Sequence, residues 1–233
     1  MKASRSCLIF YLLLAILSLG LIVVSFQFDT PVRNAILEKQ GKDWKKTSNY
    51  EMVASISKYG DWPQLALIGV IGIAIAARLR SRRWTEILAA ALIASTAAGI
   101  LANFSRLSTG RTRPRESPKI EQGFYGPWHD GKLTVGNSKF NSFPSGHTAT
   151  AVGFAAPFLF ARTLLSIPIF TLALLIAWSR MALGAHHLSD VVTSTLLALF
   201  VGWFTLRWVR EKGETTLHSL LTWFRARFLK KAN

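Results

Sequence analysis

Six apolar runs, separated from one another by polar or charged segments, constrain what this chain can fold into more than any other feature. They cover residues 8–28, 62–77, 87–104, 148–161, 164–181 and 191–208. Several approach the roughly 20 residues that an α-helix needs to cross the hydrocarbon layer of a bilayer, although the second and fourth runs are short. The pattern predicts an all-α fold, an integral membrane bundle of six transmembrane helices with a long extramembrane loop between helices 3 and 4.

The ends of the chain complete the expected organisation. The first run resembles the apolar part of a cleaved signal peptide, but it is longer than usual and no clear small-residue cleavage site follows. We therefore expect a retained helix. The chain is expected to divide into a first transmembrane helix with a polar surface segment (1–61), a five-helix membrane core (62–208) and a basic amphipathic tail (209–233).

The charge of the chain points to a membrane surface as its partner. The 28 Lys and Arg residues against 12 Asp and Glu give a formal net charge of +16, and these charges cluster between the apolar runs. That distribution favours anionic lipid and phosphate headgroups over nucleic acid. Cys7 is the only cysteine, so no disulfide can form within the chain. No cluster of acidic or cysteine residues indicates a metal ion or another cofactor.

Alternation of the six expected helices brings three distant segments to one face of the membrane. The first segment ends helix 3, the second opens helix 4, and the third lies between helices 5 and 6. The polar residues gathered at that face are Arg106, Arg113, Ser145, His147, Arg180, His186 and Asp190. Ionisable residues at a membrane face of this kind tend to mark function, so we expect a site there.

The segment NSFPSGHTAT, residues 141–150, opens the fourth apolar run with chemistry suited to an anion. Pro144 suits the edge of a helix, Ser145 is a favoured N-cap residue, and Gly146 lets a ligand approach the backbone. The free N–H groups of a helix N-terminus form an anion site, here next to His147. An ordinary helix cap with an unrelated histidine explains the same letters, so this segment alone leaves the function open.

The segment SRMALGAHHLSD, residues 179–190, adds a histidine that a carboxylate can orient. Asp190 follows His186 by four residues and His187 by three, so on a helix it can accept the ring N–H of either. A carboxylate in that place makes the other ring nitrogen more basic, which suits a nucleophile. Arg180 adds a planar cation that matches phosphate oxygens. A helix-capping cluster at the water interface is the alternative.

The segment RLSTGRTRPRESP supplies further cations. Arg106 and Arg113 are seven residues apart, and Pro114 marks the departure from helix. Arg111 and Arg115 are expected to be ordinary loop charges that face anionic lipid. Any one of these cations, taken alone, could equally be solvated or lie along the headgroups.

Together, RLSTGRTRP, PSGH and SRMALGAHHLSD resemble the three-part signature of the type 2 phosphatidic acid phosphatase superfamily, also called lipid phosphate phosphatases. The resemblance covers about residues 85–208, with the order and internal spacing of the motifs intact. It implies six helices and a metal-free site that faces the periplasm or lumen. It also implies that His186 rather than His187 is the nucleophile. Asp190 would orient this nucleophile, and His147 would be the general acid.

The resemblance also implies a set of groups that hold the phosphoryl oxygens. They are Arg106, Arg113, Ser145, Gly146 and Arg180. The first motif of the family usually opens with Lys, whereas this chain has Arg106. Arginine keeps the charge but changes the reach and the donor geometry, so the role of this residue is the least fixed.

The implied function is a membrane lipid phosphatase. Such an enzyme removes a phosphate monoester or diphosphate from a lipid through a phosphohistidine intermediate, without a metal. The alternatives are transfer of the phosphoryl group to another lipid, a haloperoxidase built on the same anion site, and non-catalytic binding or transport of anionic lipid. The apolar runs argue against the haloperoxidases, which are soluble. Candidate substrates are undecaprenyl diphosphate, phosphatidylglycerophosphate, phosphatidate and lipid A phosphates; neither the substrate nor the oligomeric state can be chosen from sequence.

The orientation in the membrane follows from the positive residues only in part, because they divide evenly between the two sides. When Arg106, Arg113 and Arg180 are left out of the count because they belong to the motifs, the membrane side that holds both termini has more Lys and Arg residues than the other side. The positive-inside rule places that side in the cytoplasm. We expect a multi-pass protein of the inner (plasma) membrane, with both termini cytoplasmic and the site facing the periplasm or exterior.

Overall fold

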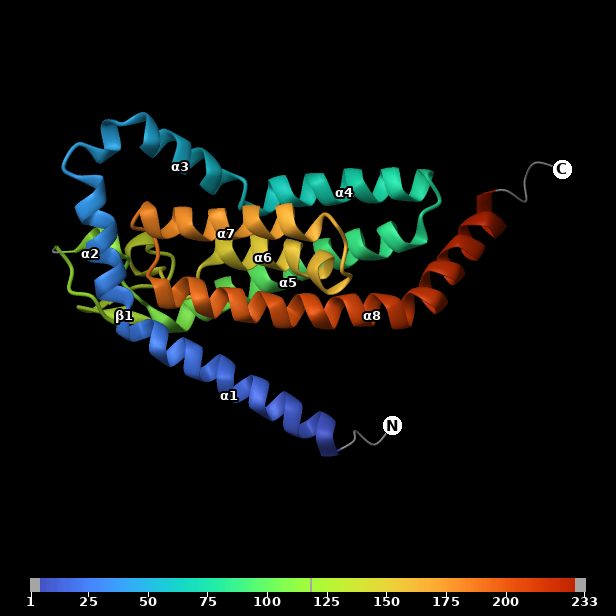
Figure 1. The fold of residues 1–233 in the computed structure, drawn as a ribbon, viewed down its shortest axis with the longest axis horizontal. Helices are drawn as coiled ribbons and strands as arrows, with labels where there is room; N and C mark the ends of the chain where they lie inside the picture. The colour runs from blue at the N-terminus through green and yellow to red at the C-terminus, as the bar shows by residue number, and fades with distance from the viewer. Residues whose placement is uncertain (1–4, 118, 229–233) are drawn as a thin grey trace.

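The computed structural model describes residues 5–117 and 119–228, with side chains at residues 9–117 and 119–212. This part of the chain is mostly helical (Figure 1). Its α-helices are α1 (Arg5–Gln27), α2 (Asp29–Gln40), α3 (Ser48–Lys58), α4 (Trp62–Arg78), α5 (Arg82–Thr109), α6 (Gly146–Phe160), α7 (Ser166–Ala182) and α8 (Leu188–Phe228). Short 3-10 turns are η1 (Trp44–Lys46), η2 (Pro114–Glu116) and η3 (Ser138–Phe140), and a small hairpin pairs β1 (Trp128–His129) with β2 (Lys132–Leu133).

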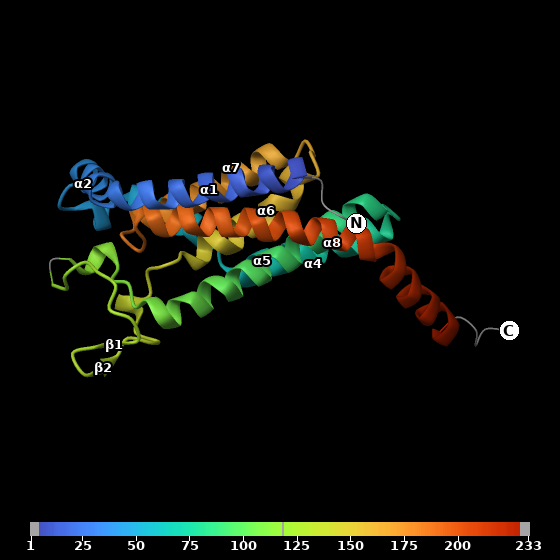
Figure 2. The ribbon, with the colours of Figure 1, turned by 90° about the horizontal axis from the view of Figure 1, so that it is seen from below.

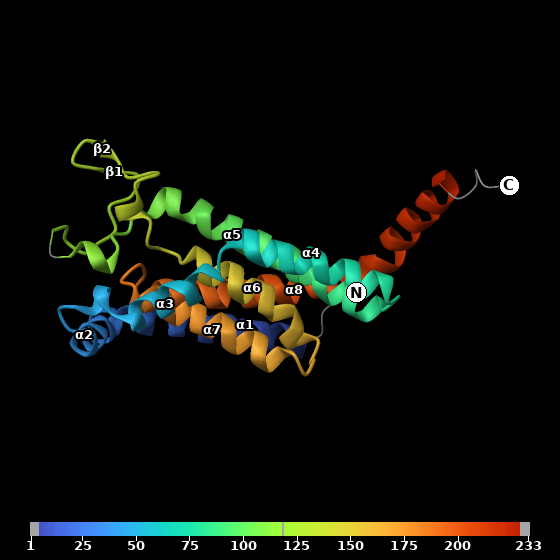
Figure 3. The ribbon, with the colours of Figure 1, turned by 90° about the horizontal axis from the view of Figure 1, so that it is seen from above.

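The helices α4 to α8 form an elongated bundle whose two ends differ. The helix α2, the β1–β2 hairpin and the loops that follow α5 and α7 gather at one end, as all three views show (Figures 1, 2 and 3). The turn between α4 and α5 and the far end of α8 lie at the other. The helix α1 runs along the outside of α8, and α2 then crosses the end of the bundle. The two ends therefore differ in architecture, and the motif segments belong to the end that carries the loops.

Small residues let α5 and α6 approach closely at the centre of the bundle. Ala94 and Ala98 of α5 are completely buried. A Cβ on Gly153 of α6 would lie 2.9 Å from the backbone oxygen of Ala94, so a larger residue does not fit there. Ser95 of α5 donates a hydrogen bond of 2.9 Å to the backbone oxygen of Thr150 on α6. Contacts between small residues and hydrogen bonds across the interface are the usual means of packing helices in lipid.

Within the described residues, three helices are long and apolar enough to cross a membrane. They are residues 9–27 of α1, all of α5, and residues 188–212 of α8. The helices α3 and α4, bent by 54° at their junction, would make a fourth crossing if they form one broken span. The helix α7 is apolar but shorter. The six-span arrangement thus stays a prediction, whereas the helical, membrane-embedded character is plain.

The structure adds detail to two segments of the expected organisation. The residues between the first two apolar runs, expected as a polar surface segment, form α2, η1 and α3, and α3 continues into the second run through a bend. At the other end, α8 continues as helix to Phe228 rather than stopping before a separate tail. The predicted amphipathic face of that tail lies outside the residues whose side chains are described.

Candidate active site

Hydrogen bonds to backbone oxygens join the three motif segments at one end of the bundle. The backbone N–H of Ser145 donates to the backbone oxygen of Asp190 over 3.3 Å. Arg106 at the end of α5 donates through Nε to the backbone oxygen of Pro144 over 2.9 Å. The segments that carry PSGH, HHLSD and the first arginine motif are therefore in direct contact, as the alternation of helices predicted.

His186 is held in the tautomer that a nucleophile requires. Its ring is 2% exposed, and Nδ1 lies 2.6 Å from the backbone oxygen of Ser142. Because a carbonyl oxygen only accepts, Nδ1 carries the proton and Nε2 keeps a free lone pair. Burial, aided by the charges of Arg106 and Arg180 and opposed by Asp190, lowers the pKa of His186 to about 3. The imidazole is therefore neutral at pH 7.

Asp190 supports this histidine mainly through its neighbours. The carboxylate lies 3.6 Å from Nδ1 of His186, longer than a hydrogen bond, so the Ser142 carbonyl takes the short contact that the sequence assigned to Asp190. The fully buried carboxylate accepts from the Ser142 hydroxyl over 2.5 Å and from the backbone N–H of His187 over 2.7 Å. It also accepts from Arg111. Asp190 thus holds Ser142 in place, and the carbonyl of Ser142 orients the ring of His186.

Arg111 is not the lipid-facing loop charge that the sequence indicated. It is 6% exposed and bridges Asp190 to Asp29, whose carboxylate lies 2.6 Å from Nη2. Asp29 in turn accepts from the backbone N–H and the hydroxyl of Ser189, over 2.8 and 2.7 Å. The guanidinium also lies over the ring of Phe124, 4.7 Å from its centroid. The start of α2 and the start of α8 are thereby joined through one arginine.

His147, at the first turn of α6, has a carboxylate partner that the sequence reading missed. Its Nε2 lies 2.6 Å from Oδ1 of Asp61, which occupies the bend between α3 and α4. An acidic residue directly before an apolar run was the available signal, but nothing local pairs it with a histidine 86 positions away. The site therefore contains two histidines, each close to a carboxylate.

Three arginines, Arg106, Arg113 and Arg180, converge on this region. The Nε atoms of Arg113 and Arg180 are buried and have no hydrogen-bond partner among the described residues. Burial, together with the positive charges of Arg115, Arg106 and Arg180, lowers the pKa of Arg113 to about 10. Guanidinium groups held together in this way are suited to bind an anion such as phosphate.

Gly146 and Ser145 shape the approach of Arg106 to α6. A Cβ on Gly146 would lie 2.7 Å from Nη2 of Arg106, so a side chain there would displace the guanidinium from this place. Ser145 is the N-cap of α6 but makes no side-chain cap bond; its hydroxyl accepts from Thr148 over 2.9 Å. The arginine therefore reaches the N-terminus of α6, where free N–H groups favour an anion.

A cavity of about 200 Å³ opens beside these groups. Its lining includes Ser57, Asp61, Arg115, His147 and Arg180. In the residues that the structure describes, no three His, Cys, Asp or Glu side chains are grouped as metal ligands. The chemistry that the site offers is a neutral imidazole, a second histidine beside a carboxylate, and several guanidinium groups.

Comparison with known proteins places this chain in one protein family and finds lipid phosphatases among its relatives. A profile described as the PAP2 superfamily matches residues 84–214. The lipid A 1-phosphatases of Rhizobium etli and Rhizobium johnstonii are each 32% identical over 108 residues, which cover 46% of this chain and 43% and 41% of those proteins. The match thus spans less than half of the length of these curated relatives.

Two solved membrane-protein structures share the fold. LpxE of Aquifex aeolicus superposes with a TM-score of 0.53 at 18% identity, covering 77% of this chain and 95% of that one. A PAP2-type phosphatidylglycerolphosphate phosphatase of Bacillus subtilis gives a TM-score of 0.52 at 20% identity, covering 87% and 94%. At these identities the likeness concerns the fold alone.

Proposed function

The chain belongs to the PAP2 superfamily, and from this membership and the geometry of the site we propose that it is a membrane lipid phosphatase. Its substrate is a phosphate monoester or diphosphate on a lipid headgroup, and the reaction passes through a phosphohistidine without a metal ion. The observation that carries the proposal is a neutral, oriented imidazole, His186, in one site with Arg113 and Arg180, whose buried Nε groups have no hydrogen-bond partner among the described residues.

In the first step, Arg106, Arg113 and Arg180 bind the phosphoryl oxygens and neutralise their charge. The lone pair on Nε2 of His186 forms a bond to phosphorus as the bond to the lipid oxygen breaks. Burial and the charge of Arg180 lower the pKa of His147 to about 4, so the negative charge of the bound phosphoryl group and of Asp61 must favour its protonated form in the complex. The leaving oxygen then takes a proton from His147, which becomes neutral. The proton on Nδ1 of His186 stays in place and is donated to the Ser142 carbonyl, and Asp190 nearby compensates the positive charge that develops on the ring.

In the second step, neutral His147 accepts a proton from water as the water oxygen bonds to phosphorus. The phosphorus–nitrogen bond breaks, its electron pair returns to Nε2 of His186, and inorganic phosphate leaves. Both histidines are then in their starting states. Transfer to a second lipid would differ only in the hydroxyl that attacks, so the released product distinguishes the two reactions.

The test is phosphate release by the purified protein from a panel of lipid phosphates, in detergent with EDTA. His186→Asn and His147→Gln should each lose activity by about 10²-fold or more, whereas His129→Gln in the β1–β2 hairpin should retain it. Denaturation during turnover should trap an acid-labile phosphohistidine in the wild type and none in His186→Asn. Substantial turnover by His186→Asn, or a requirement for a divalent metal, would contradict the proposal.

A further inference from the structure

The β1–β2 hairpin has two faces that differ in their surroundings. Trp128 pairs with Leu133 across the strands, and His129 pairs with Lys132. Because residues paired across a hairpin project to the same side and neighbours along a strand alternate, each pair belongs to one face. His129 packs on Tyr125, with ring centroids 4.1 Å apart. Trp128 and Leu133 are instead 59% and 55% exposed, so the face that they share is an exposed apolar surface.

The base of the hairpin is tied to the end of α5. The backbone N–H of Gly126 donates to the backbone oxygen of Thr109 over 3.1 Å, and that of Tyr125 donates to Gly110 over 3.2 Å. Gly110 has a φ of +54°, and a Cβ on it would collide with the backbone oxygen of Gly126. The hairpin therefore keeps a fixed position relative to the last turn of this helix.

The end of α5 lies at the boundary between hydrocarbon and headgroups. This helix is one of those long and apolar enough to cross a membrane. From Ile87 to Leu107 it rises about 30 Å, at 1.5 Å per residue, which is the thickness of the hydrocarbon core. Ile100, Phe104 and Leu107 are exposed and recur at helical spacing, so they face lipid up to the last turn. The hairpin lies beyond this turn (Figures 2 and 3), at the level of the headgroups.

The residues of the hairpin suit that level. Tryptophan is enriched where membrane and water meet, because its ring is apolar and its N–H reaches polar groups. Leu133 adds apolar area that can enter the boundary with the acyl chains. Lys132 and Lys139 are exposed in the same loop and can contact anionic headgroups. A position next to the lipid-facing end of α5 favours the bilayer over a soluble partner as the occupant of this face.

We propose that the apolar face of the hairpin, formed by Trp128 and Leu133, docks on the bilayer interface at the active-site end of the bundle. The side chain of Trp128 lies among the headgroups and that of Leu133 reaches the upper acyl chains. Asp130, in the turn between the strands, stays in water. This role goes beyond the proposed reaction, because neither residue takes part in it.

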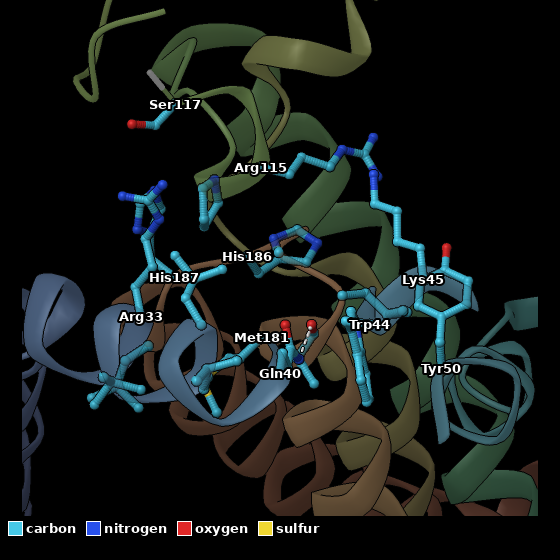
Figure 4. Close-up of a pocket in the computed structure, with 18 of the residues that line it drawn as sticks. Arg33, Gln40, Trp44, Lys45, Tyr50, Arg115, Ser117, Met181, His186 and His187 are labelled. Carbon is cyan, nitrogen blue, oxygen red and sulfur yellow. Dashed lines mark hydrogen bonds between the residues drawn. The ribbon is translucent and has the colours of Figure 1, made fainter. Parts of the chain in front are cut away.

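Docking there positions the loop that supplies part of the site. Within this loop, the backbone N–H of Arg113 donates to the backbone oxygen of Lys139 over 2.9 Å. Arg115 of the same loop lines a cavity of about 470 Å³ together with His186 (Figure 4). The hairpin thus holds these groups at a set depth, where the phosphate of a bilayer lipid lies.

The first test measures depth in the membrane at two adjacent positions. The full chain, in a Cys7→Ser background, is reconstituted in vesicles of phosphatidylcholine and phosphatidylglycerol. An environment-sensitive dye is attached to Leu133→Cys or to Lys132→Cys, which project to opposite faces. Lipids brominated high on the acyl chain should quench the dye at residue 133 about threefold more than the dye at residue 132. Equal quenching would refute the docking, and a disulfide between two copies of Leu133→Cys would then assign the face to self-association.

The second test separates docking from the reaction. The double variant Trp128→Gln, Leu133→Gln should lower phosphate release from a long-chain lipid phosphate in vesicles about three- to tenfold. Its activity on a short-chain, monomeric lipid phosphate should stay within about twofold. Leu79→Gln, which changes an exposed apolar residue at the opposite end of the bundle, is the matched control.

The outcomes of the two tests are independent. Equal losses on the vesicle and the monomeric substrate would place the hairpin in the site itself and overturn the docking. If the wild type turns over neither substrate, the proposed function fails. The quenching experiment needs no substrate, so it still decides whether the hairpin docks on the bilayer.

Discussion

At the level of single residues, Arg111 shows how a buried cation can control a reaction that it does not touch. It holds Asp190 and Asp29 at once, and Asp190 holds Ser142, whose carbonyl fixes His186. A lysine has a compact charge and cannot form the same two-sided contact. Arg111 is therefore a positioning residue, and its loss should affect the rate more than the binding of substrate.

For Arg111→Lys we expect kcat to fall about ten- to a hundredfold with KM changed by less than about threefold. The midpoint of thermal unfolding should also fall, because breaking a buried ion pair costs up to about 3–5 kcal/mol. Steady-state kinetics and a melting curve in detergent measure both effects. Arg207→Lys, on the exposed part of α8, is the control. A rise in KM alone would instead place Arg111 in direct contact with substrate.

The pair of His147 and Asp61 makes a prediction about the leaving group. If His147 protonates the leaving oxygen, losing either residue should matter most when that oxygen is a poor leaving group, as in an alkyl lipid. We expect Asp61→Asn to lower kcat about tenfold on a lipid phosphate. On an aryl phosphate with an acidic phenol the loss should be much smaller. Equal losses on both substrates would mean that Asp61 serves only to pack the bend.

Burial of His186 also makes stability depend on pH. Its pKa is lowered from 6.5 to about 3 in the folded protein, so the unfolded chain binds the proton first as the pH falls. The stability from keeping the ring neutral is complete above pH 6.5 and is lost as the pH falls toward 3, at about 1.4 kcal/mol per unit. Melting temperatures of the wild type should fall through this window, and those of His186→Asn should fall less. Parallel curves would contradict the buried, neutral ring.

At the level of elements, Gly146 and Gly153 lie on the same helix but have different neighbours. A Cβ on Gly146 meets the flexible end of Arg106, whereas a Cβ on Gly153 meets the backbone of α5. Gly146→Ala should therefore lower kcat/KM about tenfold or more with little effect on melting. Gly153→Ala should instead destabilise the bundle by about 1–3 kcal/mol. Equal melting temperatures for the two variants would show that α5 and α6 are less tightly packed than described.

The elements also show what the sequence could predict. Runs of apolar residues are local, so the positions of α1, α5, α7 and the start of α8 could be read directly. The meeting of three motifs at one end of the bundle followed from helix alternation. The contact of Asp29 with Ser189, 160 residues apart, has no local signature. For the same reason Arg111 was misassigned and Asp61 was overlooked, since an isolated charge in a polar segment does not identify its partner.

At the scale of the molecule, the site depends on parts of the chain outside the PAP2 match. The match begins at residue 84, yet Asp29 and Asp61 both lie before it. The matched region contains His147, His186 and the arginines, whereas Asp29 at the start of α2 and Asp61 at the bend before α4 come from outside it.

The two ends of the bundle finally predict how the protein lies in the membrane. The end opposite the site carries Arg78, Arg80, Arg82 and Arg83 at the turn between α4 and α5. Because cytoplasmic loops retain an excess of positive residues, we expect this turn inside the cell and the β1–β2 hairpin outside. In a Cys7→Ser background, an impermeant maleimide should label Asp130→Cys in intact cells but Leu79→Cys only after permeabilisation. The reverse pattern would place the reaction in the cytoplasm, where the lipids of the inner leaflet would be its substrates.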